Sequence, residues 1–354
     1  MLRKFLTMAT MAVAPCALVL SQDSTKPAEP EKTTTITGSV DVYYRYNFSN
    51  AKSASATNNP TSFTNSHNSF ELGMASVKVA HSFGKISGVI DLGFGSRARE
   101  FSYNETGITQ AIKQAYVTYA PSDKVTFTMG KFGTHVGYEL LDPQLNRNYS
   151  MSYMFSYGPF SHTGLKMDVA VSQNFGFMVG VANPTDYLSA SFEKKFFLGQ
   201  LHFATTNGKF TAFVNYVGGK DTAKTSQNQF DLVATVKVTD KFSIGANGTI
   251  KYVKPDGLSS ESWKGAALYL NVDPTEKLGL TLRGEVFDDK KNVTTYFGTS
   301  LYEATLTLNI KPMSGLIIMP ELRLDGAKDP YFTKHDGTGT KTTSSFILAA
   351  VYSF

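Results

Sequence analysis

The chain has 354 residues, which is enough for one large β domain or for two domains of ordinary size. Its formal net charge is +5, yet no run of Lys and Arg exceeds two residues, so a basic nucleic-acid-binding patch is excluded. The single cysteine, Cys16, excludes a disulfide framework. Aromatic residues make up 13% of the chain, a content typical of barrels that place rings at two membrane interfaces.

The first 21 residues have the layout of a secretory signal peptide. Two basic residues precede an uncharged run that ends at Ser21, and Val19 and Ser21 suit a cut after position 21. An N-terminal anchor helix and a lipoprotein cut before Cys16 are alternatives, and Pro15 fits both poorly. We therefore predict that residues 1–21 are a signal peptide.

The next segment, residues 22–35, is polar and contains proline, and we predict a flexible periplasmic lead-in. From Ile36 onward apolar and polar residues alternate, which places them on opposite faces of a strand. The strands run for about ten residues or more, compared with about five or six in soluble sheets. Pro320 lies within one of them, where we expect a gap in the ladder and a bulge. The clearest strands are 36–48, 230–238, 278–288, 302–311 and 318–325.

Tight turns and longer polar loops set the number of strands. Seven tight turns and eight longer loops make fifteen connections, hence sixteen strands with both termini on the short-turn side. Two strands, near 175–184 and 193–206, alternate poorly, so fourteen strands stay an alternative. We predict an all-β fold: a transmembrane antiparallel up-and-down β-barrel over residues 36–354. The turns lie near residues 84, 122, 175, 207, 240, 275 and 313, and the loops near 49–68, 98–109, 134–160, 185–192, 220–226, 255–261, 289–297 and 328–342.

A stretch of about 50 residues around the longest loop resembles the OmpL-like β-barrel porin family of Gram-negative bacteria, and the C-terminal aromatic strand is similar to that family too. The resemblance implies an outer-membrane barrel that acts as a porin. The matching pieces are Gln114-Ala115-Tyr116-Val117, Gly130-Lys131-Phe132, Gly137-Tyr138-Glu139, Asn148-Tyr149-Ser150, Ser152-Tyr153 and His162-Thr163-Gly164.

We therefore expect passive diffusion of small hydrophilic solutes or ions through a water-filled barrel in the cell outer membrane. The alternative is a barrel with a plugged lumen that anchors a surface binding or adhesion function. Most of the longer loops have fewer than 20 residues, which is little material for a receptor surface and favours the pore.

The loop at 134–160 is the candidate constriction, because loops of this length are usually functional or disordered and its many rings argue against disorder. Its charges are expected to form an eyelet, with aromatic side chains available to stack on a sugar-like solute. A loop packed outside on the rim is the alternative. The constriction candidates are Lys131, Glu139, Asp142, Arg147, Tyr149 and Tyr153.

The inward strand faces carry charges of both signs, which a lumen wide enough for water keeps hydrated. We expect Arg283 to pair with Glu285 and Arg323 with Glu321, which predicts weak ion selectivity. The lumen-lining candidates are Arg45, Asp231, Lys237, Arg283, Glu285, Glu303, Lys311, Glu321, Arg323 and Asp325.

Catalytic and cofactor chemistry is not predicted. The six histidines have no metal spacing, Gly-x-Ser-x-Gly does not occur, and Ser161 beside His162 is read as a hydrogen-bonded rim pair. The expected partners are outer-membrane lipid, small hydrophilic solutes and the barrel assembly machinery, for which Tyr352 and Phe354 are the candidate signal; nucleic acid is not expected. A homotrimer is plausible for a barrel of this size by analogy.

Overall fold

The computed structural model describes residues 32–354, except 54–55, 192, 222–223 and 294–297. The predicted signal peptide and residues 22–31 of the predicted lead-in lie outside the described residues. Residues 32–35 were expected in the lead-in but form the start of the first strand, where they pair with β2. The three threonines in this segment are β-branched and suit an extended backbone.

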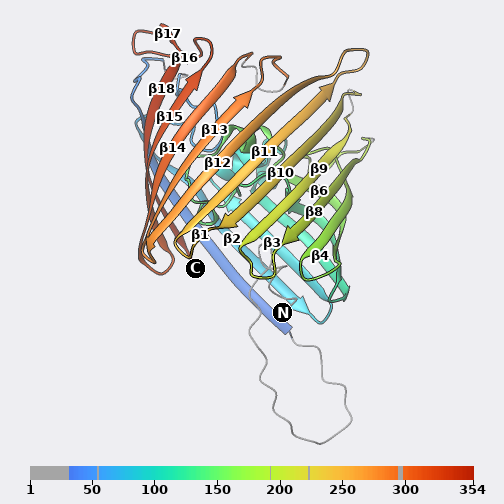
Figure 1. Ribbon diagram of the computed structural model, residues 1–354. Coiled ribbons are helices and arrows are strands. Elements are labelled where there is room, and N and C mark those ends of the chain that lie inside the picture. The colour runs from blue at the N-terminus through green and yellow to red at the C-terminus, as the bar shows by residue number, and fades with distance from the viewer. Residues whose placement is uncertain (1–31, 54–55, 192, 222–223, 294–297) are drawn as a thin grey trace, which may run out of the picture.

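The described chain forms one closed antiparallel barrel of sixteen strands, in which β1 pairs with β18 to close the sheet (Figure 1). The predicted fold class and strand number are confirmed. The barrel strands are β1 (Lys32–Asn47), β2 (Ser69–Phe83), β3 (Ile86–Phe94), β4 (Ile112–Ser122), β5 (Val125–Gly133), β6 (Ser161–Ala170), β7 (Phe175–Ala182), β8 (Phe196–Ala204), β9 (Phe210–Lys220), β10 (Ser226–Lys237), β11 (Phe242–Lys254), β12 (Glu261–Thr275), β13 (Leu278–Asp288), β14 (Ser300–Met313), β15 (Leu316–Ala327) and β18 (Thr342–Ser353).

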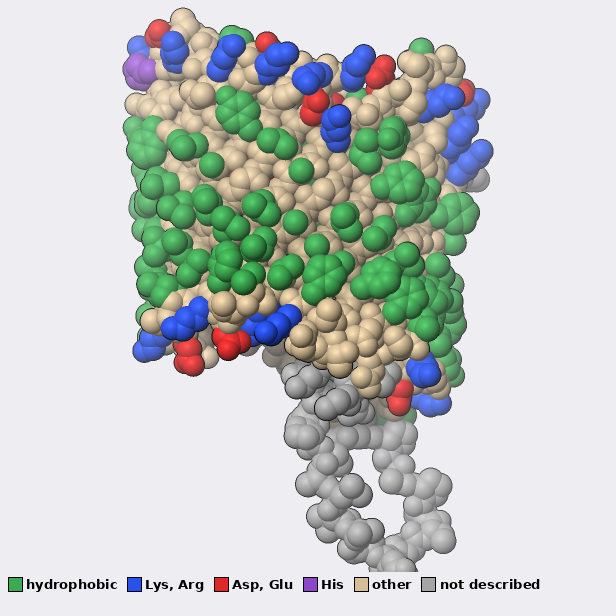
Figure 2. Space-filling model, viewed as in Figure 1, with side chains coloured by type: hydrophobic (Ala, Val, Ile, Leu, Met, Phe, Trp, Pro, Cys, Tyr) green, Lys and Arg blue, Asp and Glu red, His purple; other side chains and the backbone are tan. Residues whose placement is uncertain are grey.

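Alternation along each strand gives the barrel an apolar outside. In β14 every second residue from Tyr302 to Ile310 is apolar and exposed, and the residues between them, from Glu303 to Asn309, are polar and buried inside. Figure 2 shows a broad hydrophobic band across the outer face in view, with Lys and Arg gathered at both rims. Closure leaves no open sheet edge, so the backbone hydrogen bonds of a strand in hydrocarbon are met by its two neighbours.

The connections follow the predicted plan. All seven predicted tight turns join consecutive strands at one end of the barrel, called the turn end below. The start of β1 and the end of β18 lie at this end too (Figure 1). The opposite end, called the loop end below, carries the longer connections. The two strands whose alternation is poor are present as β7 and β8.

Pro320 behaves differently from the expectation. β14 pairs with β15 at Thr307–Glu321 and again at Ile310–Ile318, with the same register on both sides of the proline. The ladder therefore has the predicted gap, because proline donates no N–H, but the predicted bulge is wrong. The regular pairing of β15 with β18 on its other side, which includes Pro320–Leu348, holds the register.

Helices and one small hairpin lie in the connections. Within the described ranges, no helix has the length and apolar character needed to cross a membrane. These elements are α1 (Ser96–Phe101), the 3-10 turns η3 (Gly107–Ala111) and η4 (Pro143–Leu145), α2 (Tyr153–Tyr157), and the hairpin of β16 (Phe332–Thr333) and β17 (Gly339–Thr340).

Candidate functional site

The connection between β5 and β6, residues 134–160, folds into the lumen, which was one of the two positions that the sequence left open, and does not lie on the rim. It is called the lumen loop below. η4 contacts β18, and α2 contacts β12 and β13, so the loop crosses the interior of the barrel. Tyr149, Met151 and Tyr153 in its second half are fully buried. The loop therefore fills much of the space that sixteen strands enclose.

The sequence of the loop fixes its own short helix. The Ser152 hydroxyl caps α2 by accepting a hydrogen bond from the Phe155 N–H at 3.1 Å. The same hydroxyl donates to the Glu139 carboxylate at 2.8 Å, and the Ser152 N–H donates to the same oxygen at 2.8 Å. Glu139 therefore ties the first half of the loop to the start of α2.

Two glutamates on the barrel wall hold the loop through its backbone. The Glu285 carboxylate on β13 accepts the N–H groups of Tyr153 and Met154, at 2.6 and 2.8 Å. The Glu321 carboxylate on β15 accepts the N–H groups of Tyr149 and Ser150, at 2.7 and 3.1 Å. Hydrogen bonds to an ionised acceptor are among the stronger kinds. The predicted ion pairs Arg283–Glu285 and Arg323–Glu321 are therefore wrong, because backbone N–H groups of the loop occupy both carboxylates.

Two arginines on the same wall complete the attachment. The Arg283 guanidinium donates to Glu139 and to Glu303, both at 2.6 Å, and to the carbonyl oxygen of Ser150 at 2.7 Å. Arg323 donates to the carbonyl oxygen of Met151 at 2.6 Å and pairs with its neighbour on β15, Asp325, at 2.8 Å. Both arginines are buried, so each is stabilised only while these partners remain in place.

The far edge of the loop meets β1, β4 and α1. The Tyr149 hydroxyl donates to Asp41 on β1 at 2.6 Å, and the Arg97 guanidinium of α1 lies over the Tyr149 ring at 5.0 Å. Asp142 of the loop pairs with Lys113 on β4 at 2.5 Å. The loop is thus also fixed to β1 and β4.

The predicted charged eyelet does not assemble in the structure. Glu139 pairs with Arg283, Asp142 with Lys113, and Arg147 with Asp273 of β12 at 2.7 Å. Lys131 donates to the Ser102 hydroxyl at 3.0 Å and to the Ile112 carbonyl oxygen at 2.8 Å. The charges are separated because the loop crosses the lumen, so each one meets a different strand.

The predicted aromatic candidates are also occupied. Tyr149 and Tyr153 are fully buried, and their hydroxyls donate to Asp41 and Asp325. Neither ring is open for stacking on a sugar-like solute in this conformation, because both rings pack into the attachment of the loop.

All ten lumen-lining candidates lie on inward strand faces. Lys237 is half exposed at the turn end, where it pairs with Asp240, and Lys311 is partly exposed near the same end. The remaining eight are buried: Arg45, Asp231, Arg283, Glu285, Glu303, Glu321, Arg323 and Asp325.

Sequence reasoning missed two parts of this interior. Arg97 of α1 enters the lumen beside Asp41, a position that strand alternation does not predict. The inward face of β18 is apolar, with Ile347, Ala349 and Val351 packed in the same cluster as Tyr149. A signal was present, because residues 346–352 are apolar at consecutive positions and a strand with two apolar faces has both faces covered.

Two titratable groups outside the strands hold the ends of the lumen loop. Asp186 accepts the N–H groups of Phe160 and Ser161, both at 2.7 Å, and burial raises its pKa to about 6. At the other end, His135 Nε2 lies 3.0 Å from the Tyr216 carbonyl oxygen, and burial lowers the pKa of His135 to about 4. His135 is therefore neutral at pH 7. Among the described residues, no group of three or more His, Cys, Asp or Glu side chains is arranged to hold a metal ion.

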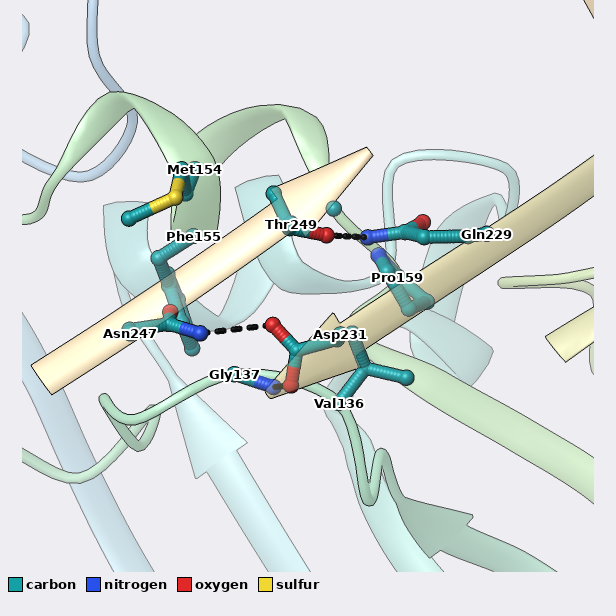
Figure 3. Close-up of a pocket in the computed structure, with 10 residues that line it drawn as sticks. Val136, Gly137, Met154, Phe155, Pro159, Gln229, Asp231, Asn247 and Thr249 are labelled. Atoms are coloured by element: carbon teal, nitrogen blue, oxygen red, sulfur yellow. Dashed lines mark hydrogen bonds between the residues drawn. The ribbon is translucent and has the colours of Figure 1, made fainter. Parts of the chain in front are cut away.

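One wall differs from the rest. Between the loop and strands β10 and β11 lies a cavity of about 10 Å³, room for one water molecule. Its polar lining comes from Gln229, Asp231, Asn247 and Thr249 on the two strands, as Figure 3 shows. Asp231 accepts the Gly137 N–H at 3.0 Å.

Solved structures share this fold. The anion-selective porin from Comamonas acidovorans superposes with a TM-score of 0.64 at 11% identity, over 92% of this chain and 100% of that one. The outer membrane channel DcaP of Acinetobacter baumannii gives a TM-score of 0.62 at 14% identity, over 91% and 97% of the two chains. Outer-membrane expressed OmpT of Vibrio cholerae gives 0.60 at 10% identity, over 95% and 100%. At these identities the likeness concerns the fold alone.

The sequence itself identifies the family. No curated protein matches the chain. Residues 33–354 match the family described as "Putative beta-barrel porin-2, OmpL-like", which covers nearly the whole barrel. The outer surface contacts membrane lipid, and both the family and the fold are those of channels rather than enzymes. The chain therefore belongs to the OmpL-like β-barrel porin family and is an outer-membrane porin channel for small solutes.

Proposed function

We propose that the lumen loop is the constriction of this porin and that it limits which small hydrophilic solutes or ions diffuse through. The attachment of the loop to the wall by Glu285 and Glu321 supports this most strongly, since it fixes the loop inside the lumen. Buried side chains around the loop leave little free cross-section, so we expect a low conductance. In this proposal the constriction candidates mainly hold the loop, and Asp231 belongs to the lining.

Conductance of variants tests this role of the loop. The double variant Glu285→Gln/Glu321→Gln puts an amide NH₂ where each carboxylate accepts two backbone N–H groups, which weakens the attachment. Single-channel conductance in a planar bilayer is expected to rise above the wild-type value. Glu276→Gln, in an exposed turn, is the matched control and is expected to conduct like the wild type. Equal conductance of double variant and wild type, with both folded, contradicts the constriction role.

The anchoring alternative makes a different prediction. A barrel that only anchors a surface binding function gives no current and no solute uptake in liposomes, although it is correctly folded. The family and the neighbouring folds are channels, which favours the pore.

We further propose that the chain catalyses no reaction. His162, the residue beside Ser161, has its Nε2 3.1 Å from the Thr134 hydroxyl and its ring 5.4 Å from that of His135. The predicted Ser161–His162 rim pair is therefore wrong, because neighbouring residues on a strand point to opposite faces. Absence of hydrolysis of peptide, ester and phospholipid substrates by the folded barrel tests this proposal.

Export and assembly are proposed from the ends of the chain. Residues 1–21 are proposed to direct export and to be removed, which mass spectrometry of the mature protein tests. Tyr352 and Phe354 are proposed as the signal for the barrel assembly machinery, because both rings are exposed beside the closing pair of Gly38 and Phe354. A homotrimer is proposed for the membrane form, and cross-linking in membranes tests it.

A further inference from the structure

The wall of β10 and β11 is lined differently from the wall that holds the loop. Five consecutive pairs of inward positions run from Lys237–Ser243 at the turn end to Gln229–Lys251 at the loop end. Val233 is the only hydrocarbon side chain among these ten positions, and Gly245 has no side chain. This track is therefore polar along its length and carries Lys237 and Lys251 at its two ends, whereas β18 places the apolar Ile347, Ala349 and Val351 against Tyr149 of the loop.

The loop meets this wall through a hydrogen bond to Asp231 and through packing of Tyr138 against Gly245. In the described residues no ion pair joins the loop to β10 or β11, and the Gly137 N–H donates to Asp231. The cavity of about 10 Å³ lies at this contact, with polar side chains on the strand side and the edge of the loop opposite (Figure 3). The Gln229 side-chain oxygen is buried there without a hydrogen-bond partner. A polar cavity of this size has room for a water molecule, so the contact is not completely filled by protein.

Asp231 carries a negative charge at this contact. Its carboxylate accepts from Gly137 N at 3.0 Å, from Asn215 Nδ2 at 2.7 Å and from Asn247 Nδ2 at 2.6 Å. These three partners are all donors, an arrangement that stabilises the ionised form of the carboxylate. Among the described residues Asp231 has no Lys or Arg in an ion pair, whereas Glu139, Glu303 and Asp325 are each paired with an arginine.

We infer that solutes cross the lumen along the β10–β11 track, between this wall and the lumen loop, and that Asp231, which lines the small cavity there, makes the channel prefer cations to anions. The inference rests on the proposed function, since it places the path beside the proposed constriction. An unpaired carboxylate in a narrow polar passage attracts cations and repels anions.

Cysteine accessibility tests the path. The barrel sequence contains no cysteine, because Cys16 precedes it, so single substitutions report one position each. Thr249→Cys lies on the track, and Ser345→Cys, on β18, is a matched control with a similar small buried hydroxyl. A cationic methanethiosulfonate reagent is expected to reduce the current of folded Thr249→Cys by more than half and to leave Ser345→Cys and the wild type unchanged.

The outcomes separate the inference from the function on which it rests. If the channels conduct but Thr249→Cys is unaffected, or Ser345→Cys is blocked equally, the path is wrong while the porin function stands. If the folded wild type passes no current at all, the proposed diffusion function fails and the inference fails with it.

Reversal potentials test the role of Asp231. Asp231→Asn keeps a carbonyl oxygen for the Gly137 N–H and removes the charge, so the potassium-to-chloride permeability ratio is expected to fall several-fold. Asp168→Asn removes the same charge from an inward position of β6, away from the track, and is expected to keep the wild-type ratio. A ratio in Asp231→Asn equal to that of the wild type overturns the assignment.

Discussion

The wall of β13, β14 and β15 meets the lumen loop with buried ion pairs, whereas among the described residues the wall of β10 and β11 meets it with polar side chains and no ion pair. On the first wall, Arg283, Glu285, Glu321 and Arg323 bind the loop through its backbone and through Glu139. On the second wall the loop donates to Asp231 beside a small cavity.

This difference shows how one loop can be anchored to one wall of the barrel while solutes pass between the loop and another wall. Charged groups that are buried and paired resist separation, because each partner left alone is costly in a low dielectric. A hydrogen-bonded contact without an ion pair is separated at less cost, because water replaces its hydrogen bonds. The first wall therefore sets where the loop lies, and the second sets where the remaining free space is.

The largest expected effect comes from Arg283→Met, which breaks the anchored side. It leaves Glu139 and Glu303 as buried carboxylates without their cation, a loss of about 3–5 kcal/mol. We expect a lower urea midpoint for unfolding and a higher single-channel conductance, because the loop is released. Lys311→Met, a partly exposed inward cation near the turn end, is the control with little expected effect. Unchanged conductance in folded Arg283→Met would show that the loop is held by other contacts.

A smaller effect is expected at the end of the loop, and it depends on pH. Burial raises the pKa of Asp186 to about 6, above its unfolded value of about 3.9, so the folded state binds the proton more tightly. Protonation of Asp186 therefore adds its full contribution to the free energy of unfolding below about pH 4, and this contribution is lost as the pH rises to about 6. Relative to Asp186→Asn, the wild type should lose roughly 2–3 kcal/mol of unfolding free energy over that range.

Urea unfolding at several pH values measures this difference. His135 acts with the opposite sign, because burial lowers its pKa to about 4 and its stabilising effect is lost as the pH falls from about 6.5. That contribution is present in both proteins and cancels in the comparison. Asp240→Asn, an almost fully exposed carboxylate in a turn, should show no such trend relative to the wild type. A pH-independent difference for Asp186→Asn contradicts the raised pKa.

The smallest expected effect is on the weakly held side. Gly137 has a φ of +94°, and an added Cβ meets no atom within 4 Å, so Gly137→Ala is strained only through its backbone, by about 1 kcal/mol. We expect a slight change in conductance, smaller than that of Arg283→Met. Gly133→Ala, whose Cβ meets Gln114 at an ordinary 3.7 Å, is the control. A larger effect for Gly137→Ala than for Arg283→Met would reverse the assignment of the two walls.

Strand and loop positions were predictable because their signals are local. The expected loop at 134–160 fills the gap between the end of β5 at Gly133 and the start of β6 at Ser161. Alternation with a period of two and turn residues between apolar runs depend on neighbours in the sequence, so the strand count follows without knowledge of contacts.

The partners of the buried charges were not predictable in the same way. Glu285 and Arg283 are two residues apart on one face of β13, which suggested a pair, but Glu285 binds the loop backbone and Arg283 binds Glu139, 144 residues away in sequence. The partner of each charged side chain depends on where the loop lies. Almost every residue has a backbone N–H group, so the sequence does not show which of these groups a carboxylate binds.

The sequence by itself determined the membrane barrel: sixteen alternating strands, their turns, the inward set of charges and the long loop. Only the tertiary structure decided that the loop is anchored to β13, β14 and β15, that α1 brings Arg97 into the lumen and that Asp231 makes no ion pair with any described residue. The physical reason is the distance along the sequence over which each kind of interaction acts. Strand formation reflects preferences over a few residues, whereas charge pairing inside a barrel depends on which distant segments the closed sheet brings together.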